Sequence, residues 1–168
     1  MIVKIARFTD RRLLLGTTEN FQIFNPSDNH FLTYSYNKTK PEGISYSRVT
    51  DILVENDSTI WIGTPKGLNR FNPLTGSFKS FYEKDGLPDD FIKGITMDSS
   101  GFLWVTTGHG VCRIDCRNDI KRILPGKTAC RATNFWKGVS LKPGTEIFTS
   151  EESKGLILFS PVKLLKTE

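Results

Sequence analysis

Short runs of apolar residues alternate with turn-forming residues along the whole chain, and the runs recur in the same order. The segment 60–71 reads Ile-Trp-Ile-Gly-Thr, then Pro-Lys, then Gly-Leu-Asn-Arg-Phe. Weaker copies of this pattern occur upstream and downstream, and the large residue that heads each copy recurs after 47, 43 and 44 residues, at Leu14, Trp61, Trp104 and Phe148. A repeat of this length built from short β runs predicts a propeller-type array of blades.

Each repeat contains up to four apolar or alternating runs separated by tight turns. The second copy is the clearest, with runs at 49–54, 59–64, 67–72 and 78–82. Asn-Asp-Ser and Pro-Leu-Thr-Gly stand between these runs and favour turns. Four antiparallel strands joined in this way form a propeller blade. No window has sustained 3.6-residue periodicity, so we expect almost no helix.

The fold class that follows is all-β, an incomplete β-propeller of about four blades and fifteen strands in a single domain, 1–168. The expected blades span approximately 1–36, 48–82, 91–125 and 134–168, and the last is incomplete. A closed propeller takes four to eight blades. Further blades of a longer parent chain, or a second copy, are therefore expected to complete the ring, and we favour the parent chain. The open edges predict that the isolated chain dimerises or aggregates.

The residues at the head of each repeat are expected to wedge between neighbouring blades. They lie in mid-strand among apolar neighbours, and the position varies from Trp to Leu14 and Phe148, which are both good core residues. A repeated Trp is also a stacking platform for sugars or bases in some proteins. The core interpretation is favoured because Leu and Phe replace Trp.

Charge and composition exclude some classes of function. The chain has 168 residues, 38% hydrophobic content and a net charge of +5, which is typical of a folded chain. The basic excess is concentrated between 113 and 131, and no aromatic side chain lies between residues 111 and 131 to stack bases. A solvated blade edge protected by charge is the favoured interpretation, and we expect no nucleic-acid partner.

No apolar stretch reaches the ~18 residues of a membrane helix, so a membrane would be reached only through a segment outside this chain. The three cysteines are Cys112, Cys116 and Cys130. Cys112 and Cys116 could pair across a short turn, or Cys112 could be a buried thiol on its strand. The two histidines are far apart and no Cys/His cluster has zinc spacing, so we expect no metal and no cofactor.

These repeats resemble the two-component regulator propeller family. The pattern is carried by Val49-x-x-Ile52, Trp61-Ile62-Gly63-Thr64, Gly67-Leu68-x-x-Phe71-x-Pro73, Gly86-Leu87-Pro88, and by Asp98, Gly101, Leu103, Trp104 and Gly110. The end of the chain is similar to the closing blade of such propellers, with Gly155-Leu156-x-x-Phe159-x-Pro161. The first copy departs from the pattern, because it has Asn20 in place of Gly67 and no Trp.

The resemblance implies the periplasmic sensing part of a hybrid sensor histidine kinase, for which fragments of polysaccharides are the usual signals. The chain would be the C-terminal part of one propeller, followed in the parent receptor by a small immunoglobulin-like domain and a transmembrane helix. Kinase motifs are absent from these residues, so phosphotransfer would belong to other segments. No enzymatic activity is expected in this chain.

A ligand is expected on the propeller face where two sets of loops gather. One set joins the second and third strands of each blade, at 17–19, 64–66, 107–109 and 150–154. The other joins successive blades, at 37–48, 83–90 and 126–136. Such loops carry binding function on rigid scaffolds. An oligosaccharide would need aromatic faces near charged groups, and the candidate residues are Tyr46, Arg48, Asp89, Asp90, Lys93, His109, Phe135 and Trp136.

Each candidate also has a structural interpretation. Asp89 and Asp90 could cap a turn, His109 could be an exposed loop residue, and Trp136 could seal the closing blade. The adjacent carboxylates do not suit a glycosidase, because neighbouring strand residues point in opposite directions and hydrolysis needs two carboxyls facing one bond. The competing functions are a sensor propeller, a protein-interaction propeller or orphan fragment without a kinase, and a propeller lyase or glycosidase.

Overall fold

The computed structural model describes residues 1–8, 11–39, 42–116, 146–148 and 158–160. In these residues almost all regular structure is β-strand. The single helical element among them is one 3₁₀ turn, η1 (Glu83–Asp85). The expectation of an all-β chain with almost no helix is therefore confirmed.

The strands form three sheets of propeller type and one short pair. The first sheet has the order β1-β2-β3-β4 and the second β5-β6-β7-β8, while the third has β11-β10-β9 and the pair is β12-β13. The strands are β1 (Ile2–Arg7), β2 (Leu13–Thr17), β3 (Phe21–Asn25), β4 (His30–Tyr34), β5 (Asp51–Asn56), β6 (Thr59–Thr64), β7 (Gly67–Asn72), β8 (Ser77–Phe81), β9 (Ile92–Met97), β10 (Phe102–Thr107), β11 (Val111–Asp115), β12 (Glu146–Phe148) and β13 (Leu158–Ser160). All neighbouring strands are antiparallel.

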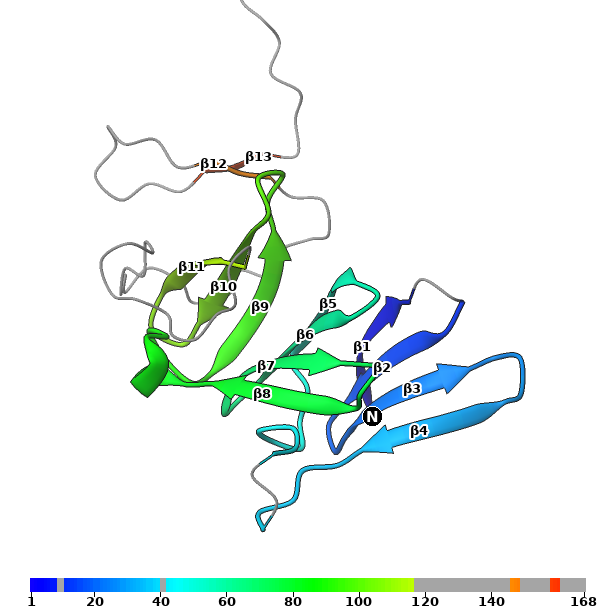
Figure 1. The fold of residues 1–168 in the computed structure, drawn as a ribbon. Helices are drawn as coiled ribbons and strands as arrows, with labels where there is room; N and C mark the ends of the chain where they lie inside the picture. The colour runs from blue at the N-terminus through cyan, green and yellow to red at the C-terminus, as the bar shows by residue number, and fades with distance from the viewer. Residues whose placement is uncertain (9–10, 40–41, 117–145, 149–157, 161–168) are drawn as a thin grey trace, which may run out of the picture.

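The three sheets follow one another as an open array of blades (Figure 1). Their first strands, β1, β5 and β9, lie side by side, as the innermost strands of a propeller do. The first strand of the second blade begins at Asp51 rather than at Val49. The amides of the two preceding residues, Val49 and Thr50, donate to the carbonyls of Thr17 and Gly63 respectively. The fourth strand expected at 120–124 and most of the fourth blade lie outside the described residues.

Side-chain caps explain where several hairpins turn. The carboxamide oxygen of Asn56 accepts the amide of Ser58, and that of Asn72 accepts the amide of Leu74. The carboxylate of Asp98 accepts the amides of Ser100 and Phe102 in the same way. Short Asn and Asp side chains favour turns because they can replace backbone acceptors in this manner.

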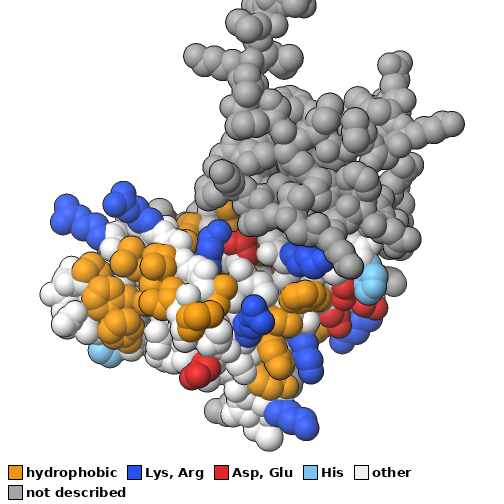
Figure 2. Space-filling view, turned by 180° about the vertical axis from the view of Figure 1, so that it is seen from behind, with side chains coloured by type: hydrophobic (Ala, Val, Ile, Leu, Met, Phe, Trp, Pro, Cys, Tyr) orange, Lys and Arg blue, Asp and Glu red, His pale blue; other side chains and the backbone are white. Residues whose placement is uncertain are grey.

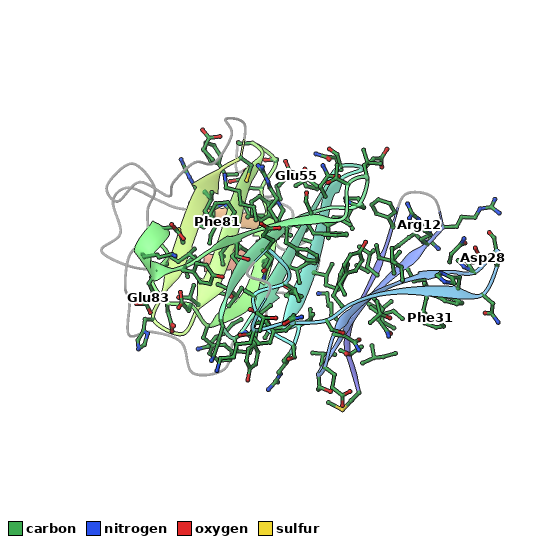
Figure 3. All side chains as sticks on the ribbon, turned by 60° about the horizontal axis from the view of Figure 1, so that its bottom comes forward. Arg12, Asp28, Phe31, Glu55, Phe81 and Glu83 are labelled. Atoms are coloured by element: carbon green, nitrogen blue, oxygen red, sulfur yellow. The ribbon has the colours of Figure 1, made fainter. Side chains whose placement is uncertain are left out.

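Two apolar cores fill the spaces between the blades. One lies between the first and second sheets and the other between the second and third. The first core contains Phe8, Leu14, Phe21, Ile23, Ile44, Val49, Ile52, Ile60, Ile62 and Phe71. The second contains Trp61, Leu68, Phe81, Leu87, Ile92, Ile95, Leu103, Val105, Cys112 and Ile114. Figure 3 labels Phe81 at the end of β8, where it belongs to the second core, and Phe31 on the first sheet.

The head residues of the first two repeats occupy the predicted wedge positions. Leu14 belongs to the core against the second sheet and Trp61 to the core against the third, both with no exposed surface. The indole N–H of Trp61 donates to the Glu55 carboxylate at 2.7 Å. The indole of Trp104, which is 3% exposed, donates to Asp98 at 2.8 Å. The second and third blades therefore each satisfy a buried indole with an acid from their own first hairpin.

The glycine of the Trp-Ile-Gly-Thr run is required by the approach of the next blade. A Cβ on Gly63 would lie 2.8 Å from Ile92 and 2.9 Å from Thr50 Oγ1, and one on Gly16 would lie 2.5 Å from Val49. These distances are shorter than side chains tolerate. The glycine therefore sets how closely successive blades stack.

One buried carboxylate connects the first strands of all three blades. Asp51 in β5 accepts the Lys4 ammonium of β1 at 2.6 Å and the Ile95 amide of β9 at 2.8 Å. The strand register places Lys4, Asp51 and Gly94 at the same position of successive blades, opposite Gly16, Gly63 and Thr106. The inner strands are therefore joined by a polar contact as well as by apolar packing.

Cys116 is a free thiol, so the pairing of Cys112 with Cys116 that the sequence leaves open does not form. Burial raises the pKa of Cys116 to about 12, and the nearby charges of Glu55 and Asp115 add to this effect. Cys112 is buried on β11 with no exposed surface, and it is disulfide-bonded, so the alternative of a buried thiol at this position is also wrong. Cys130 lies outside the described residues.

Candidate functional site on the loop face

The turns that join the second and third strands of the three blades have the same construction. In each, a buried threonine hydroxyl donates to a carbonyl three residues later, from Thr17 at 3.0 Å, Thr64 at 2.9 Å and Thr107 at 3.0 Å. The same hydroxyl accepts the amide of the residue two positions later, and these residues are Glu19, Lys66 and His109. All three of their side chains are exposed. One rigid turn thus presents a different charged or polar side chain from each blade.

The loops between blades join these turns to form one continuous surface. The amide of Gly67 donates to the Asp90 carbonyl at 2.8 Å, and the amide of Gly108 donates to the Phe91 carbonyl at 2.9 Å. Ser45, in the preceding interblade loop, bonds Asn69 and Thr64. Backbone and side-chain contacts therefore hold the turns at 64–66 and 107–109 against the interblade loops at 37–48 and 83–90.

The side chains of Asp89 and His109 contact each other on this surface. His109 Nδ1 lies 2.9 Å from Asp89 Oδ2, and the side chain of His109 is 74% exposed while that of Asp89 is 14% exposed. The other oxygen of Asp89 accepts the Phe91 amide at 3.0 Å. A Cβ on Gly108 would collide with the Asp89 carboxylate. The half-buried carboxylate therefore orients the exposed imidazole through Nδ1.

Asp90 has a different role from its neighbour. Its carboxylate accepts the Glu83 amide at 2.7 Å, at the start of η1, and its carbonyl accepts the Gly67 amide. These contacts agree with the structural interpretation that Asp90 caps a turn. The two carboxylates serve separate partners, in agreement with the argument against a glycosidase pair.

An aromatic group lies on the next loop toward the first blade. The rings of Tyr36 and Tyr46 are 5.9 Å apart, and the Lys66 ammonium lies 5.1 Å from the centre of the Tyr46 ring. A cation over a tyrosine face is attracted by the ring quadrupole. This group supplies an aromatic face beside a positive charge, which is the combination that oligosaccharide binding favours.

The remaining candidates are distributed around these two groups. Arg48 and Lys93 are exposed, on the interblade loop and on β9 respectively. Phe135 and Trp136 lie outside the described residues, as do the loops 126–136 and 150–154. The structure thus brings Asp89 to His109 and Tyr46 to Lys66, and a role in ligand binding stays a prediction for every candidate.

The sequence analysis passed over several residues of this surface. Lys66 was placed in a ligand loop without being selected, and Tyr36 was not considered. Lys4 and Asp51, which lie on the inner strands β1 and β5 and not on this surface, were also missed. Aligning the repeats by register would have found them, because opposite charges occupy one position of adjacent blades.

Neither a metal-binding cluster nor a membrane-spanning helix occurs in the described part of the chain. No group of three or more His, Cys, Asp or Glu side chains there is placed to hold a metal ion. None of the helices described is long and apolar enough to cross a membrane.

Comparison with known families identifies part of the chain. Residues 86–109 match the family model described as "Two component regulator propeller". This segment begins in the second interblade loop and ends at His109, so it contains both members of the Asp89–His109 contact. No curated protein matches the sequence.

Solved propeller structures resemble the described sheets. The extracellular domain of BT3049 from B. thetaiotaomicron, described as a hybrid two component system, aligns over 68% of this chain and 17% of its own length, with 23% identity and a TM-score of 0.60. That of BT4673 from the same organism, described in the same way, aligns over 67% of this chain and 14% of its own, with 23% identity and a TM-score of 0.56.

An enzyme is also similar in fold. Virginiamycin B lyase from Staphylococcus aureus aligns over 66% of this chain and 36% of its own, with 18% identity and a TM-score of 0.50. This chain therefore spans about a sixth of the two extracellular domains and about a third of the lyase. The resemblance noted in the repeats is confirmed, since residues 86–109 match the model of the two component regulator propeller and the described sheets are similar in fold to propellers from hybrid two component systems.

Proposed function

We propose that this chain is part of a ligand-binding sensor propeller of a two-component signalling receptor, and that its ligand is an oligosaccharide or a fragment of a polysaccharide. The observation that carries the proposal is the position of the family match, which includes the exposed His109 and its carboxylate partner. The chain itself performs no catalysis. The signal passes to a kinase in another part of the receptor.

The chemistry of the loop face supports a sugar-like ligand. Hydroxyl groups need donors and acceptors in fixed positions, which Asp89 and His109 supply. Pyranose rings expose apolar C–H faces that stack on aromatic rings, which Tyr36 and Tyr46 supply. Lys66 and Arg48 add positive charge, so that uronic or sulfated sugars are the favoured members of this class.

Binding is tested by calorimetry with a panel of neutral, uronic and sulfated oligosaccharides. His109→Ala is the main variant, because its exposed side chain contributes little to packing. We expect it to weaken binding of a hit by about tenfold, the effect of losing one hydrogen bond of roughly 1.4 kcal/mol. His30→Ala is the matched control, because His30 is an exposed histidine on β4, outside the loop face.

Three results would count against the proposal. Binding of no oligosaccharide would contradict the ligand class, and equal losses in the two histidine variants would contradict the site. Release of a cleaved sugar from a bound oligosaccharide would favour the lyase or glycosidase alternative, for which the similarity to virginiamycin B lyase is the supporting observation.

The proposed location is the periplasm, in a receptor anchored to the inner membrane through a segment outside these residues. The support is that the similar propellers are extracellular domains. Fractionation of the cells that contain the protein tests this location. Recovery in the cytoplasm would instead favour an interaction propeller without a kinase.

A further inference from the structure

Phe91 is an exposed aromatic residue whose backbone is bonded on both sides to the Asp89 and His109 group. Its amide donates to the Asp89 carboxylate at 3.0 Å, and its carbonyl accepts the Gly108 amide at 2.9 Å. The other oxygen of that carboxylate lies 2.9 Å from His109 Nδ1. Figure 2 shows one histidine against a group of acidic side chains, in agreement with this contact. The position of Phe91 relative to the imidazole is therefore fixed by the backbone.

The backbone contact of Phe91 is a feature of the repeat. The carbonyl of Phe91 accepts the amide of Gly108 in the third blade, as the carbonyl of Met1 accepts the amide of Thr18 at 3.0 Å in the first blade. Gly108 and Thr18 both directly follow the buried threonine of their turn. The residue before the first strand of a blade is thus held against the turn that displays a side chain on the loop face.

The second blade shows that neighbouring blades leave this position open. Arg48 lies three positions before Asp51, as Phe91 lies three positions before Gly94, and the strand register makes Asp51 and Gly94 equivalent. The second blade packs against the first on one side and the third on the other, yet Arg48 is exposed. The 39% exposure of Phe91 therefore agrees with that of the equivalent residue in a blade that has a neighbour on each side.

The chemistry of Phe91 complements that of the two polar side chains beside it. A phenyl ring offers an apolar face and has no hydrogen-bonding group of its own. Asp89 and His109 supply an acceptor and a polar ring next to it. Small-molecule sites combine apolar or aromatic surface with a few fixed polar groups in this way. The ring therefore suits the C–H face of a pyranose whose hydroxyl groups reach the two polar side chains.

We propose that Phe91 is the residue on which one sugar ring of the ligand stacks, and that the hydroxyl groups of this ring bond Asp89 and His109. This inference rests on the proposed function and places a subsite at the third blade. Stacking acts on the apolar face of the sugar, so Phe91 contributes equally to the binding of neutral and acidic sugars. Arg48 and Lys66 contribute to acidic sugars alone.

The first test repeats the calorimetry of neutral, uronic and sulfated oligosaccharides with Phe91→Ala. We expect this variant to weaken the binding of every hit by about tenfold, whatever its charge, because an aromatic contact is lost. Phe31→Ala is the matched control, since Phe31 is a 49% exposed phenylalanine on β4, away from the loop face. This control should bind each hit as the unaltered chain does.

A second variant keeps an aromatic ring and reports the contact directly. Phe91→Trp should retain the affinity, and its tryptophan emission should shift to shorter wavelength when a hit saturates the protein, because the sugar removes water from the indole. Phe31→Trp is the matched reporter and should not respond. A reporter at residue 91 that does not respond to a bound hit would overturn the assignment even if Phe91→Ala failed to fold.

The outcomes separate this inference from the proposed function. If a hit binds Phe91→Ala as tightly as the unaltered chain, or if both alanine variants lose affinity equally, Phe91 is not the stacking residue and the oligosaccharide function stands. A loss limited to acidic sugars would also overturn stacking. A loss in Tyr46→Ala with none in Phe91→Ala would place the sugar ring on the loop 37–48 instead. Binding of no oligosaccharide by the unaltered chain would overturn the proposed ligand class, and this inference with it.

Discussion

Asp51 offers the most direct test of how the blades are held together at their inner edge. Its carboxylate is 13% exposed and accepts the Lys4 ammonium, the Ile95 amide of the third blade and the amide of Ile52. Asp51→Ala removes all three contacts. Asp51→Asn keeps an oxygen for one amide but loses the ion pair. Lys4→Met removes only the ion pair.

The three substitutions should lower the free energy of unfolding by different amounts. Loss of the acceptor leaves two amides unpaired, and a buried unpaired donor costs about 1–3 kcal/mol, so Asp51→Ala should destabilise by about 3–5 kcal/mol. Lys4 is a third exposed, so its ion pair is largely screened and Lys4→Met should cost roughly 0–1 kcal/mol. Asp51→Asn should fall between them, at about 1–2 kcal/mol, since one amide still loses its acceptor.

Urea unfolding followed by tryptophan fluorescence measures these differences, because Trp61 and Trp104 are buried between or within the blades. The midpoints should rank Lys4→Met, Asp51→Asn, Asp51→Ala in order of increasing loss, with similar slopes. If Lys4→Met costs as much as Asp51→Ala, the ion pair rather than the amide contacts joins the strands. If Asp51→Ala costs less than about 0.5 kcal/mol, the usual range for surface substitutions, Asp51 does not join the blades at all.

Four further predictions follow from single contacts. Trp61→Ala should lower the free energy of unfolding by about 3–5 kcal/mol, and Trp61→Phe by much less, in the same urea assay. Cys116 should react with iodoacetamide at pH 8 far more slowly in the folded chain than in urea, because burial raises the pKa of its thiol to about 12; equal rates would contradict this. Burial acts to raise the pKa of Asp98, but hydrogen bonds from Trp104, Phe102 and Ser100 and the charge of Arg113 together lower it. The stabilisation from ionised Asp98 is therefore complete above its unfolded pKa of about 3.9 and is lost as the pH falls through the lower folded value, so Asp98→Asn should reduce the difference between urea midpoints at pH 7 and pH 2. Thr107→Val should lower the free energy of unfolding by about 1–3 kcal/mol, because it leaves the His109 amide without its acceptor. His109→Ala should change it by less than about 0.5 kcal/mol. Equal losses in the two variants would refute the idea that the stability of the turn is independent of the side chain it displays.

The blades could be predicted from the sequence because the same pattern of apolar runs and turns recurs in successive repeats. Trp61 and Leu14 share a position in the repeat and a position between blades, so their spacing predicts their packing. The positions predicted for the ends of the strands were less accurate. Val49 belongs to a β-branched run, but its amide bonds Thr17 and it precedes β5. Pattern alone cannot distinguish a strand residue from an extended connection.

The candidate surface could be predicted only as a set of loops. Which side chains meet depends on how one blade is placed against the next, and no local pattern encodes that. Asp89 and Asp90 are adjacent in sequence, yet Asp89 contacts His109 and Asp90 contacts Glu83. The separation of these two roles follows from the close approach of Gly108 to Asp89, which is a contact between distant segments.

The repeated threonine turn explains how a scaffold this regular can present specific chemistry. Its two hydrogen bonds involve the threonine hydroxyl and the backbone, so they are the same whether the displayed residue is Glu19, Lys66 or His109. Changing that residue leaves the turn intact, and the charge displayed by each blade is therefore independent of the stability of the blade. Two of the three displayed residues have partners from interblade loops, Tyr46 for Lys66 and Asp89 for His109. Specificity on this face would then depend on matching a displayed residue to the interblade loop beside it, and exchanging one without the other should change ligand binding while the blades remain folded.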